Sequence, residues 1–281
     1  MQLDDRVIVV TGGGSGIGAA MCRRFAQESP RAIVVADLDG LKAAAVAAEV
    51  RTAGPGTAVA SRAVDVADEA QLGALVTEVR AEHGGLDLFC ANAGIGTGQG
   101  VEASDAAWDQ IWHVNVMAHV YAARALLPAW LEAGEGHLLI TASAAGLLVN
   151  LGDAPYTATK HAAVGLAEWL SATYGDRGLH VACLCPQGVR TPLLFGGAER
   201  GRGGNSAVGS AGEGALSTDV VKAQRVIEPE EVAEVVVEGL ADERFLILPH
   251  PEVAGYEQAK ATDRERWLRA MRRLQAKLTG R

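Results

Sequence analysis

The sequence has few cysteines, few aromatic residues and no excess of positive charge. Its 281 residues include 4 cysteines and 5% aromatic residues, with 25 Lys and Arg against 34 Asp and Glu. The cysteines form no Cys-x-x-Cys pair and no zinc-ligand spacing with histidine, which argues against a zinc finger or a disulfide framework. A net charge of −9 argues against broad nucleic-acid binding, which needs a basic surface.

Long apolar runs are also absent. No run reaches the roughly 20 residues that span a bilayer, and the first residues, MQLDDRVIVV, lack the basic and apolar regions of a secretory signal. We therefore expect a cytoplasmic protein that binds neither nucleic acid nor membrane, with its cysteines as free thiols. The length suits one large α/β domain with a sizeable core.

Short aliphatic runs alternate with longer alanine-rich stretches along the chain. The apolar runs lack strict alternation, which indicates strands buried on both faces, and the βαβ order predicts a parallel sheet with helices on each side. The expectation is a single-domain, doubly wound Rossmann fold of about seven strands over residues 1–250. A C-terminal basic helical extension is expected at 251–281. Strands are expected at 6–10, 32–37, 58–66, 86–94, 137–143, 180–186 and 244–249, and helices at about 17–29, 41–54, 69–83, 105–132 and from Tyr156 onward.

A glycine-rich stretch, TGGGSGIG (11–18), follows the first strand and opens the first helix. Its Gly12, Gly16 and Gly18 permit a tight turn and a close approach of main-chain N–H groups to a pyrophosphate. The helix N-terminus adds unpaired donors and the positive end of a dipole. The loop, with Ser15 and Ile17, is therefore predicted to bind a dinucleotide, and a purely structural turn is the alternative.

Asp37 ends the second predicted strand, about 20 residues beyond the glycines. Its carboxylate can accept hydrogen bonds from the adenosine ribose hydroxyls and would repel a 2′-phosphate. Arg31 is the nearest upstream base, but it precedes the strand and so points to the other end. NAD is therefore expected in preference to NADP. The alternative role of Asp37 is to cap the helix that follows.

Further motifs follow in order: VDV (64–66), ANAG (91–94) and YTATK (156–160). With these and the glycine loop, the sequence from residue 6 to about 250 resembles the short-chain dehydrogenase/reductase family. The resemblance implies that Asp65 lies beside the adenine and that Val66 supplies main-chain contacts. It places Asn92, Ala93 and Gly94 at the cofactor, and it implies a catalytic tetrad of Asn115, Ser143, Tyr156 and Lys160.

Tyr156 and Lys160 lie four residues apart and so share one face of a helix. A free tyrosine has a pKa near 10, whereas a general base works best near the operating pH. Because a neighbouring ammonium and a positive nicotinamide favour the phenolate, Tyr156 is expected to remove the hydroxyl proton of an alcohol and to return it in the reverse reaction. No metal is expected to take part.

The other members of the tetrad have both functional and structural interpretations. The Ser143 hydroxyl can hold the substrate oxygen, and the resemblance implies that Lys160 binds the nicotinamide ribose and that Asn115 holds a water. Taken alone, Ser143 would be a strand-end cap, Asn115 a polar residue on a helix and Lys160 a solvated side chain.

The segment PQGVRT (186–191) departs from the Pro-Gly-x-Val-x-Thr pattern of the family, because Gln187 occupies the glycine position. The sequence therefore does not predict the main-chain path of this segment. The resemblance places Pro186, Gly188, Val189 and Thr191 at the cofactor. In relatives the loop between Ser143 and Tyr156 lines the substrate pocket, and here it is rich in leucine. A hydrophobic secondary alcohol or ketone is expected, unless these leucines only pack beneath the lid. The candidate substrate residues are Leu148, Asn150, Asp153, Gln187, Leu193 and Leu194.

Two segments stand apart from the βαβ pattern. A glycine-rich stretch lies within a region, about 193–220, where relatives carry a substrate lid. The tail has a stripe of Trp267, Met271, Leu274 and Leu278 that would pack on this chain or a neighbouring subunit, with an anionic partner or a membrane surface as alternatives. The resemblance implies a homodimer or homotetramer.

Three functions fit these observations. The first is an NAD-dependent oxidoreductase of hydrophobic secondary alcohols and ketones. The second is an NADPH-dependent reductase of the 3-ketoacyl-thioester type, which Asp37 disfavours. The third is a non-catalytic NAD(H)-binding sensor or scaffold, which would have no need of Tyr156.

Overall fold

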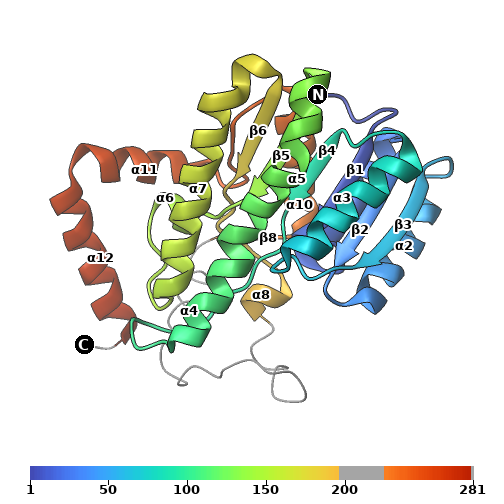
Figure 1. Cartoon of the computed structure of the whole chain (residues 1–281). Helices are drawn as coiled ribbons and strands as arrows, with labels where there is room; N and C mark the ends of the chain where they lie inside the picture. The colour runs from blue at the N-terminus through green and yellow to red at the C-terminus, as the bar shows by residue number, and fades with distance from the viewer. Residues whose placement is uncertain (196–224, 280–281) are drawn as a thin grey trace.

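The centre of the molecule is a seven-stranded parallel sheet in the order β3-β2-β1-β4-β5-β6-β9 (Figure 1). The structure, a computed structural model, describes residues 1–195 and 225–279. The strand order reverses between β1 and β4, and such a point opens a crevice at the carboxyl ends of the strands. This confirms the predicted doubly wound sheet. The strands are β1 (Val7–Thr11), β2 (Ala32–Asp37), β3 (Ala58–Ala63), β4 (Leu88–Ala91), β5 (Gly136–Thr141), β6 (Leu179–Leu184) and β9 (Leu246–Ile247), and β7 (Gly188–Val189) pairs separately with β8 (Val226–Ile227).

Helices cover both faces of the sheet. In β1, Val7 and Val9 belong to the core shared with α3, α5 and α7, whereas Ile8 and Val10 belong to the core shared with α1, α2 and α10. All four side chains are fully buried, which explains why the strand reads as an unbroken apolar run. The helices are α1 (Gly16–Phe25), α2 (Gly40–Ala53), α3 (Glu69–His83), α4 (Asp105–Trp112), α5 (Ala118–Ala133), α6 (Ala144–Leu147), α7 (Ala154–Tyr174), α8 (Pro192–Phe195), α10 (Pro229–Ala241), α11 (Glu252–Thr262) and α12 (Arg264–Thr279).

Several element boundaries differ from those expected. The predicted helix at 105–132 is divided by a π-helical turn at His113–Met117, and the first helix ends at Phe25 and continues as a 3-10 turn. The tail is two helices, because the main chain breaks at Asp263, whose carboxylate accepts a hydrogen bond from the N–H of Arg266 in α12 at 2.8 Å. The third strand ends at Ala63, and β9 has two residues.

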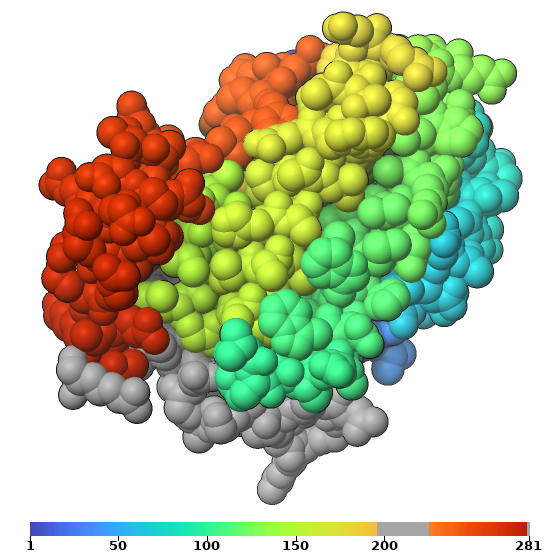
Figure 2. Space-filling model, turned by 60° about the vertical axis from the view of Figure 1, so that its left-hand side comes forward, coloured from blue at the N-terminus to red at the C-terminus, as the bar shows by residue number. Residues whose placement is uncertain are grey.

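The C-terminal helices lie at one edge of the molecule, where α12 stands beside the surface formed by α7 and the segment before it (Figure 2). The predicted apolar stripe of α12 is only partly covered, since Trp267, Met271, Leu274 and Leu278 are all of intermediate exposure. The predicted lid falls outside the described residues, apart from its first residues in α8. Within residues 1–195 and 225–279, every helix is too short or too polar to cross a membrane.

Candidate active site

The glycine loop forms a tight cradle at the carboxyl end of β1. Gly12 and Gly16 adopt positive φ angles of 63° and 52°, a region that side chains strongly disfavour. A Cβ on Gly18 would lie 2.2 Å from the main-chain oxygen of Gly12, and one on Gly16 would lie 3.1 Å from Thr191. α1 begins at Gly16 within this cradle, and no side chain caps its first N–H groups. Such a helix N-terminus fits the pyrophosphate of a dinucleotide.

Asp37 is joined directly to this loop. Its carboxylate accepts hydrogen bonds from the N–H groups of Gly14 and Asp39, both at 2.9 Å. The cap of α2 is Asp39, which accepts from two N–H groups of that helix. The alternative role of Asp37 as the helix cap is therefore wrong, and its carboxylate lies at the loop where a ribose would bind.

Two basic side chains, Arg31 and Lys42, differ in where they lie relative to the glycine loop. Arg31 pairs with Asp87 at 3.5 Å, towards the opposite end of the sheet, as expected. Lys42 lies beside the glycine loop, because a Cβ on Gly14 would be 2.8 Å from the Cβ of Lys42. The sequence reasoning missed Lys42, although its place in the first turn of the helix after Asp37 was a usable signal.

The ANAG motif connects three strand ends. Asn92 donates from Nδ2 to the main-chain oxygen of Thr11 at 3.0 Å and accepts from the hydroxyl of Thr141 at 3.1 Å. A Cβ on Gly94 would lie 3.3 Å from Asn115 Oδ1 and 3.4 Å from Lys160 Nζ. The motif therefore brings the glycine loop and the predicted catalytic residues to one place.

The two other adenine-side candidates lie just beyond β3. Asp65 accepts a hydrogen bond from the N–H of Ala67 at 2.9 Å, and Val66 is 7% exposed. Both lie in the turn that precedes α3, which Asp68 caps through its carboxylate. This turn follows the strand that pairs with β2, so both residues lie on the same side of the site as Asp37.

Asn115 lies in the π-helical turn and is fully buried. Its side chain accepts from the N–H of Ile95 and donates to the oxygen of the same residue, both at 2.9 Å. π-turns inside helices occur often at functional sites, where they redirect a side chain. Asn115 thus fixes the loop after β4, and it does so from a π-helical turn and not from a regular α-helix.

Tyr156 and Lys160 lie on one face of α7, with Lys160 Nζ 5.5 Å from the centre of the Tyr156 ring. Lys160 is 2% exposed and donates to the main-chain oxygen of Thr141 at 2.9 Å, so it is not a solvated side chain. Burial lowers the pKa of Lys160 to about 8. Burial also raises the pKa of Tyr156 to about 12, against the opposing effect of a hydrogen bond with Ser143.

This rise in the pKa of Tyr156 is opposite in direction to the lowering that was expected from Lys160 together with a positive nicotinamide. In a buried position, loss of water disfavours the phenolate more than nearby donors favour it. Further positive charge is therefore needed beside the phenol to activate it at neutral pH.

Ser143 has the capping role that was its structural alternative. Its hydroxyl accepts from the N–H of Ala145 at 3.1 Å and so caps α6. The same hydroxyl donates to the main-chain oxygen of Pro186 at 3.4 Å, and it lies near enough to Tyr156 to lower the pKa of the phenol against the effect of burial. The serine is therefore held by the main chain beside the phenol.

The altered segment 186–191 has a defined path. The oxygen of Pro186 accepts from the N–H of Ala144 at 2.8 Å, and the N–H of Gln187 donates to Nδ1 of His250 at 3.2 Å. Gln187 does not adopt a positive φ angle, so no glycine is needed there. Gly188 and Val189 then pair with β8, and Thr191 contacts the glycine loop.

Asp153 is the substrate candidate that the structure contradicts. Its buried carboxylate caps α7 by accepting from the N–H of Tyr156 at 3.0 Å, and it also accepts from Thr97 and from the N–H of Gly98 at 2.7 Å. A role in reading the substrate is therefore wrong, because these donors already occupy the carboxylate. Asp153 instead ties the loop after β4 to the start of the tyrosine helix.

The other substrate candidates differ in their surroundings. A Cβ on Gly96 would lie 3.8 Å from both Leu193 and Tyr156, so Leu193 is near the phenol. Asn150 lines a cavity of about 400 Å³ between the substrate loop and Gln275 of α12. Leu148, Gln187 and Leu194 are partly exposed.

The substrate loop is held from behind by the C-terminal extension. Lys260 of α11 is 8% exposed and donates from Nζ to the main-chain oxygens of Leu147 and Leu148. Its Nζ also lies 5.3 Å from the centre of the Trp267 ring in α12. The tail is thus joined to the loop that borders the predicted catalytic residues.

Comparison with known proteins agrees with this geometry. The family model described as short chain dehydrogenase matches residues 6–198. The 1-deoxy-11-beta-hydroxypentalenate dehydrogenase of Streptomyces exfoliatus is 35% identical over 257 residues, which cover 90% of this chain and 86% of that protein. A short-chain dehydrogenase/reductase from Burkholderia phymatum, solved in complex with NAD, has a TM-score of 0.84 and 31% identity over 94% of this chain and 96% of that one.

A second solved structure carries the other nicotinamide cofactor. L-sorbose reductase from Gluconobacter frateurii, solved with NADPH and L-sorbose, has a TM-score of 0.75 and 28% identity over 88% of this chain and 97% of that one. The chain belongs to the short-chain dehydrogenase/reductase family. It is an oxidoreductase of a family that acts on alcohols and ketones.

Proposed function

We propose that the protein is an NAD-dependent oxidoreductase that interconverts a hydrophobic secondary alcohol and its ketone. The observation that carries the proposal is the meeting of Ser143, Tyr156 and Lys160 beside Gly94, at the crevice that also holds the glycine loop. A binding module would need the glycine loop but not a half-buried phenol beside a buried lysine. This disfavours the sensor or scaffold alternative.

The residues present fit a dinucleotide. Gly12, Ser15, Gly16, Ile17 and Gly18 would hold the pyrophosphate at the N-terminus of α1. When bound, the nicotinamide accepts or supplies the hydride and brings the positive charge of its oxidised form. The other residues proposed to hold the cofactor are Asp37, Asp65, Val66, Asn92, Ala93, Gly94, Tyr156, Lys160, Pro186, Gly188, Val189 and Thr191.

Proton transfer is assigned to Tyr156. The phenol oxygen takes the hydroxyl proton during oxidation and returns one during reduction, while Ser143 holds the substrate oxygen and stabilises charge on it. Lys160 lies close enough to favour the phenolate electrostatically. Asn115 positions the loop that carries Ile95 next to Lys160.

The preference for NAD rests on Asp37, whose carboxylate lies at the glycine loop. A 2′-phosphate there would meet a negative charge. Lys42 is the observation that favours the second candidate, an NADPH-dependent reductase of the 3-ketoacyl-thioester type, because it lies beside the same loop. We rank it second because Lys42 is also 3.4 Å from the carboxylate of Asp39, which offsets its charge.

A lipophilic substrate is supported by Leu193, which lies near the phenol. Leu148 and Leu194 are proposed to line the same pocket, with Asn150 and Gln187 as polar contacts. The relative named as a hydroxypentalenate dehydrogenase fits an alcohol as substrate. A homodimer or homotetramer in the cytoplasm remains part of the proposal, on the basis of the family resemblance.

The test is turnover by the purified protein with NAD or NADP and a panel of cyclic, aromatic, steroid and hydroxyacyl alcohols. We expect the wild type to reduce NAD. The rate of NAD reduction should fall by at least about 100-fold in Tyr156→Phe, which is the usual contribution of acid–base catalysis. Tyr256→Phe is the matched control, because Tyr256 is 48% exposed on α11, and it should keep full activity. Turnover that survives Tyr156→Phe would exclude the mechanism, and a clear preference for NADP would exchange the two candidates.

A further inference from the structure

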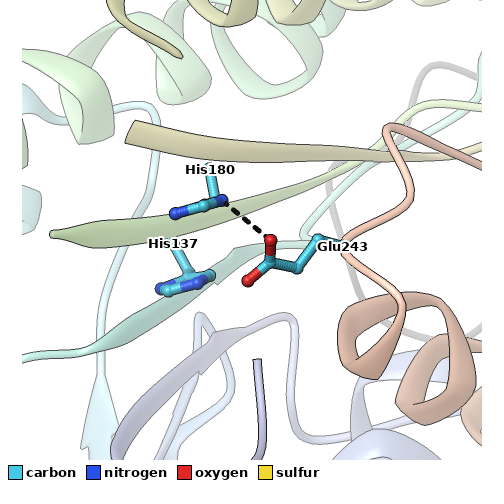
Figure 3. A group of neighbouring side chains, drawn as sticks. All are labelled: His137, His180 and Glu243. Atoms are coloured by element: carbon cyan, nitrogen blue, oxygen red, sulfur yellow. Dashed lines mark ion pairs between the residues drawn. The ribbon is translucent and has the colours of Figure 1, made fainter. Parts of the chain in front are cut away.

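Three side chains of types that can bind a metal ion lie together at the end of the sheet opposite the glycine loop. His137 and His180 are second residues of β5 and β6 and are paired in register, and Glu243 precedes β9. Ligand atoms of the three residues lie within 4.8 Å of one another. Figure 3 shows the two rings side by side with the carboxylate beside them. The cluster is therefore separate from the proposed active site.

Among the residues that the structure describes, neither ring nitrogen of His137 has a hydrogen-bond partner, although the residue is only 5% exposed. Buried polar groups are nearly always satisfied, so an unpaired one needs an explanation such as an ion or a water. The neutral imidazole is the form that binds metal. The ring thus keeps a lone pair available beside His180.

His180 and Glu243 are placed to adjust around an ion. The two rings stack with centroids 4.5 Å apart and planes within 8°, so their lone pairs run side by side and one ring must turn to share a ligand. The side chains of His180 and Glu243 are 41% and 53% exposed, so both can turn without disturbing the core. Zinc bonds of roughly 2.0–2.2 Å would bring the ligand atoms to about 3.4 Å from one another.

Two positive groups lie near the cluster, the amino group of Met1 and the guanidinium of Arg6. The amino group of Met1 is hydrogen-bonded to the oxygen of Leu240 and lies 3.8 Å from Glu243. Arg6 pairs with Asp87 at 3.3 Å and with Glu135 at 3.2 Å, which offsets its charge. Glu243 then supplies the negative charge that a divalent ion requires.

We propose that His137, His180 and Glu243 bind one Zn²⁺ ion. Two imidazoles and one carboxylate suit zinc and similar transition metals better than calcium or magnesium, which prefer oxygen ligands alone. Three protein ligands leave the fourth tetrahedral position for water. The ion would link β5, β6 and the segment before β9. Because β9 has only two residues and so few main-chain hydrogen bonds to β6, this link would stabilise the edge of the sheet.

The test is Zn²⁺ binding to the full-length protein after treatment with a chelator and desalting. Titration calorimetry should give one Zn²⁺ per chain, and thermal unfolding should show a Tm that rises with Zn²⁺ concentration, because an ion that binds only the folded state stabilises it. His180→Gln should weaken binding by at least about tenfold and remove the Tm rise, a loss on the scale of altered metal sites. His113→Gln, at an exposed position, should change neither result.

A second variant and a spectroscopic measurement distinguish the loss of a zinc ligand from misfolding of the variant. Glu243→Gln keeps the size of an exposed side chain and should also weaken binding, whereas the buried His137 is left intact. Co²⁺ in place of Zn²⁺ should give visible absorption in the wild type that both variants lose. Equal Zn²⁺ binding by the wild type and His180→Gln, or a wild-type Tm that Zn²⁺ leaves unchanged, would overturn the proposal.

Discussion

Lys160 Nζ lies 5.5 Å from the centre of the Tyr156 ring while it donates to the main-chain oxygen of Thr141 at 2.9 Å. The lysine is thus held beside the phenol by the end of β5. Burial raises the pKa of Tyr156 to about 12 and lowers the pKa of Lys160 to about 8. Both shifts favour the neutral forms, so the protein groups alone do not activate the phenol.

Tyr156 should therefore ionise only at high pH in protein without cofactor. Ultraviolet titration of the wild type against Tyr156→Phe should give a phenolate difference centred near pH 12, in line with the pKa of about 12. With NAD added, the same difference should move to lower pH, because positive charge favours the phenolate. A difference centred below the free-tyrosine value of about 10 without cofactor would contradict the role of burial.

Asp37→Asn should lower the preference for NAD over NADP by about tenfold or more, since a hydrogen bond to a charged group contributes about 1.5–3 kcal/mol. The measurement is the ratio of kcat/KM for the two cofactors. Asp68→Asn is the matched control, because Asp68 also accepts main-chain hydrogen bonds at a helix start, that of α3. An unchanged ratio in Asp37→Asn would remove the assignment of the ribose to this carboxylate.

Lys260→Met should raise KM for the alcohol more than it lowers kcat. The change removes the donor that holds the oxygens of Leu147 and Leu148, so the substrate loop loses its support while Tyr156 keeps its own contacts. A stability loss of about 1–3 kcal/mol is expected from the unpaired oxygens. Lys277→Met, at an exposed position of α12, should alter neither quantity.

For this loop the informative comparison is between stability and KM. Thermal unfolding and initial rates would be measured on the same preparations of Lys260→Met. A lower Tm with an unchanged KM would mean that the tail only stabilises the fold. A raised KM at a temperature where the variant is fully folded would support its role in substrate binding.

His119 should make the protein less stable in acid. Burial lowers the pKa of His119 to about 3 from an ordinary value of 6.5, so between pH 6.5 and 3 the unfolded chain binds a proton that the folded chain does not. The free energy of unfolding then falls as pH falls through this window, by up to about 1.4 kcal/mol per pH unit. Urea unfolding at pH 7 and pH 5 measures the effect.

His119→Leu should show a smaller loss of stability between these two pH values than the wild type. The difference between the two proteins isolates His119 from other titrating groups. His113→Gln, an exposed histidine on the same helical segment, should keep the wild-type difference. Equal losses in the wild type and His119→Leu would show that another group causes the acid sensitivity.

The sequence predicted those features that depend on local pattern. The apolar run of β1 predicted a strand that is buried on both faces. The glycine-rich motif predicted the tight loop at the end of that strand. The spacing of Tyr156 and Lys160 predicted a shared helix face, which the structure contains. The family resemblance added Asn115 and Ser143, which the fold brings to the same crevice.

Features that depend on contacts between distant segments were not predictable. The π-turn at Asn115 follows from hydrogen bonds to Ile95, while the apolar pattern around it stays helical. Asp153 was expected in the substrate pocket because it lies in the loop between Ser143 and Tyr156. Its donors at Thr97 and Gly98 lie in a loop distant in the sequence, so the sequence did not reveal that its carboxylate is occupied. His137 and His180 meet only because β5 and β6 pair in one particular register.

The reversal of strand order between β1 and β4 gives the two sides of the crevice separate origins in the chain. The glycine loop and Asp37 precede β4, whereas Ser143, Tyr156 and the substrate loop follow it. If Asp37 sets the nucleotide preference as proposed, recombination between two relatives at the β3–β4 junction should take that preference from one parent and the substrate loop from the other.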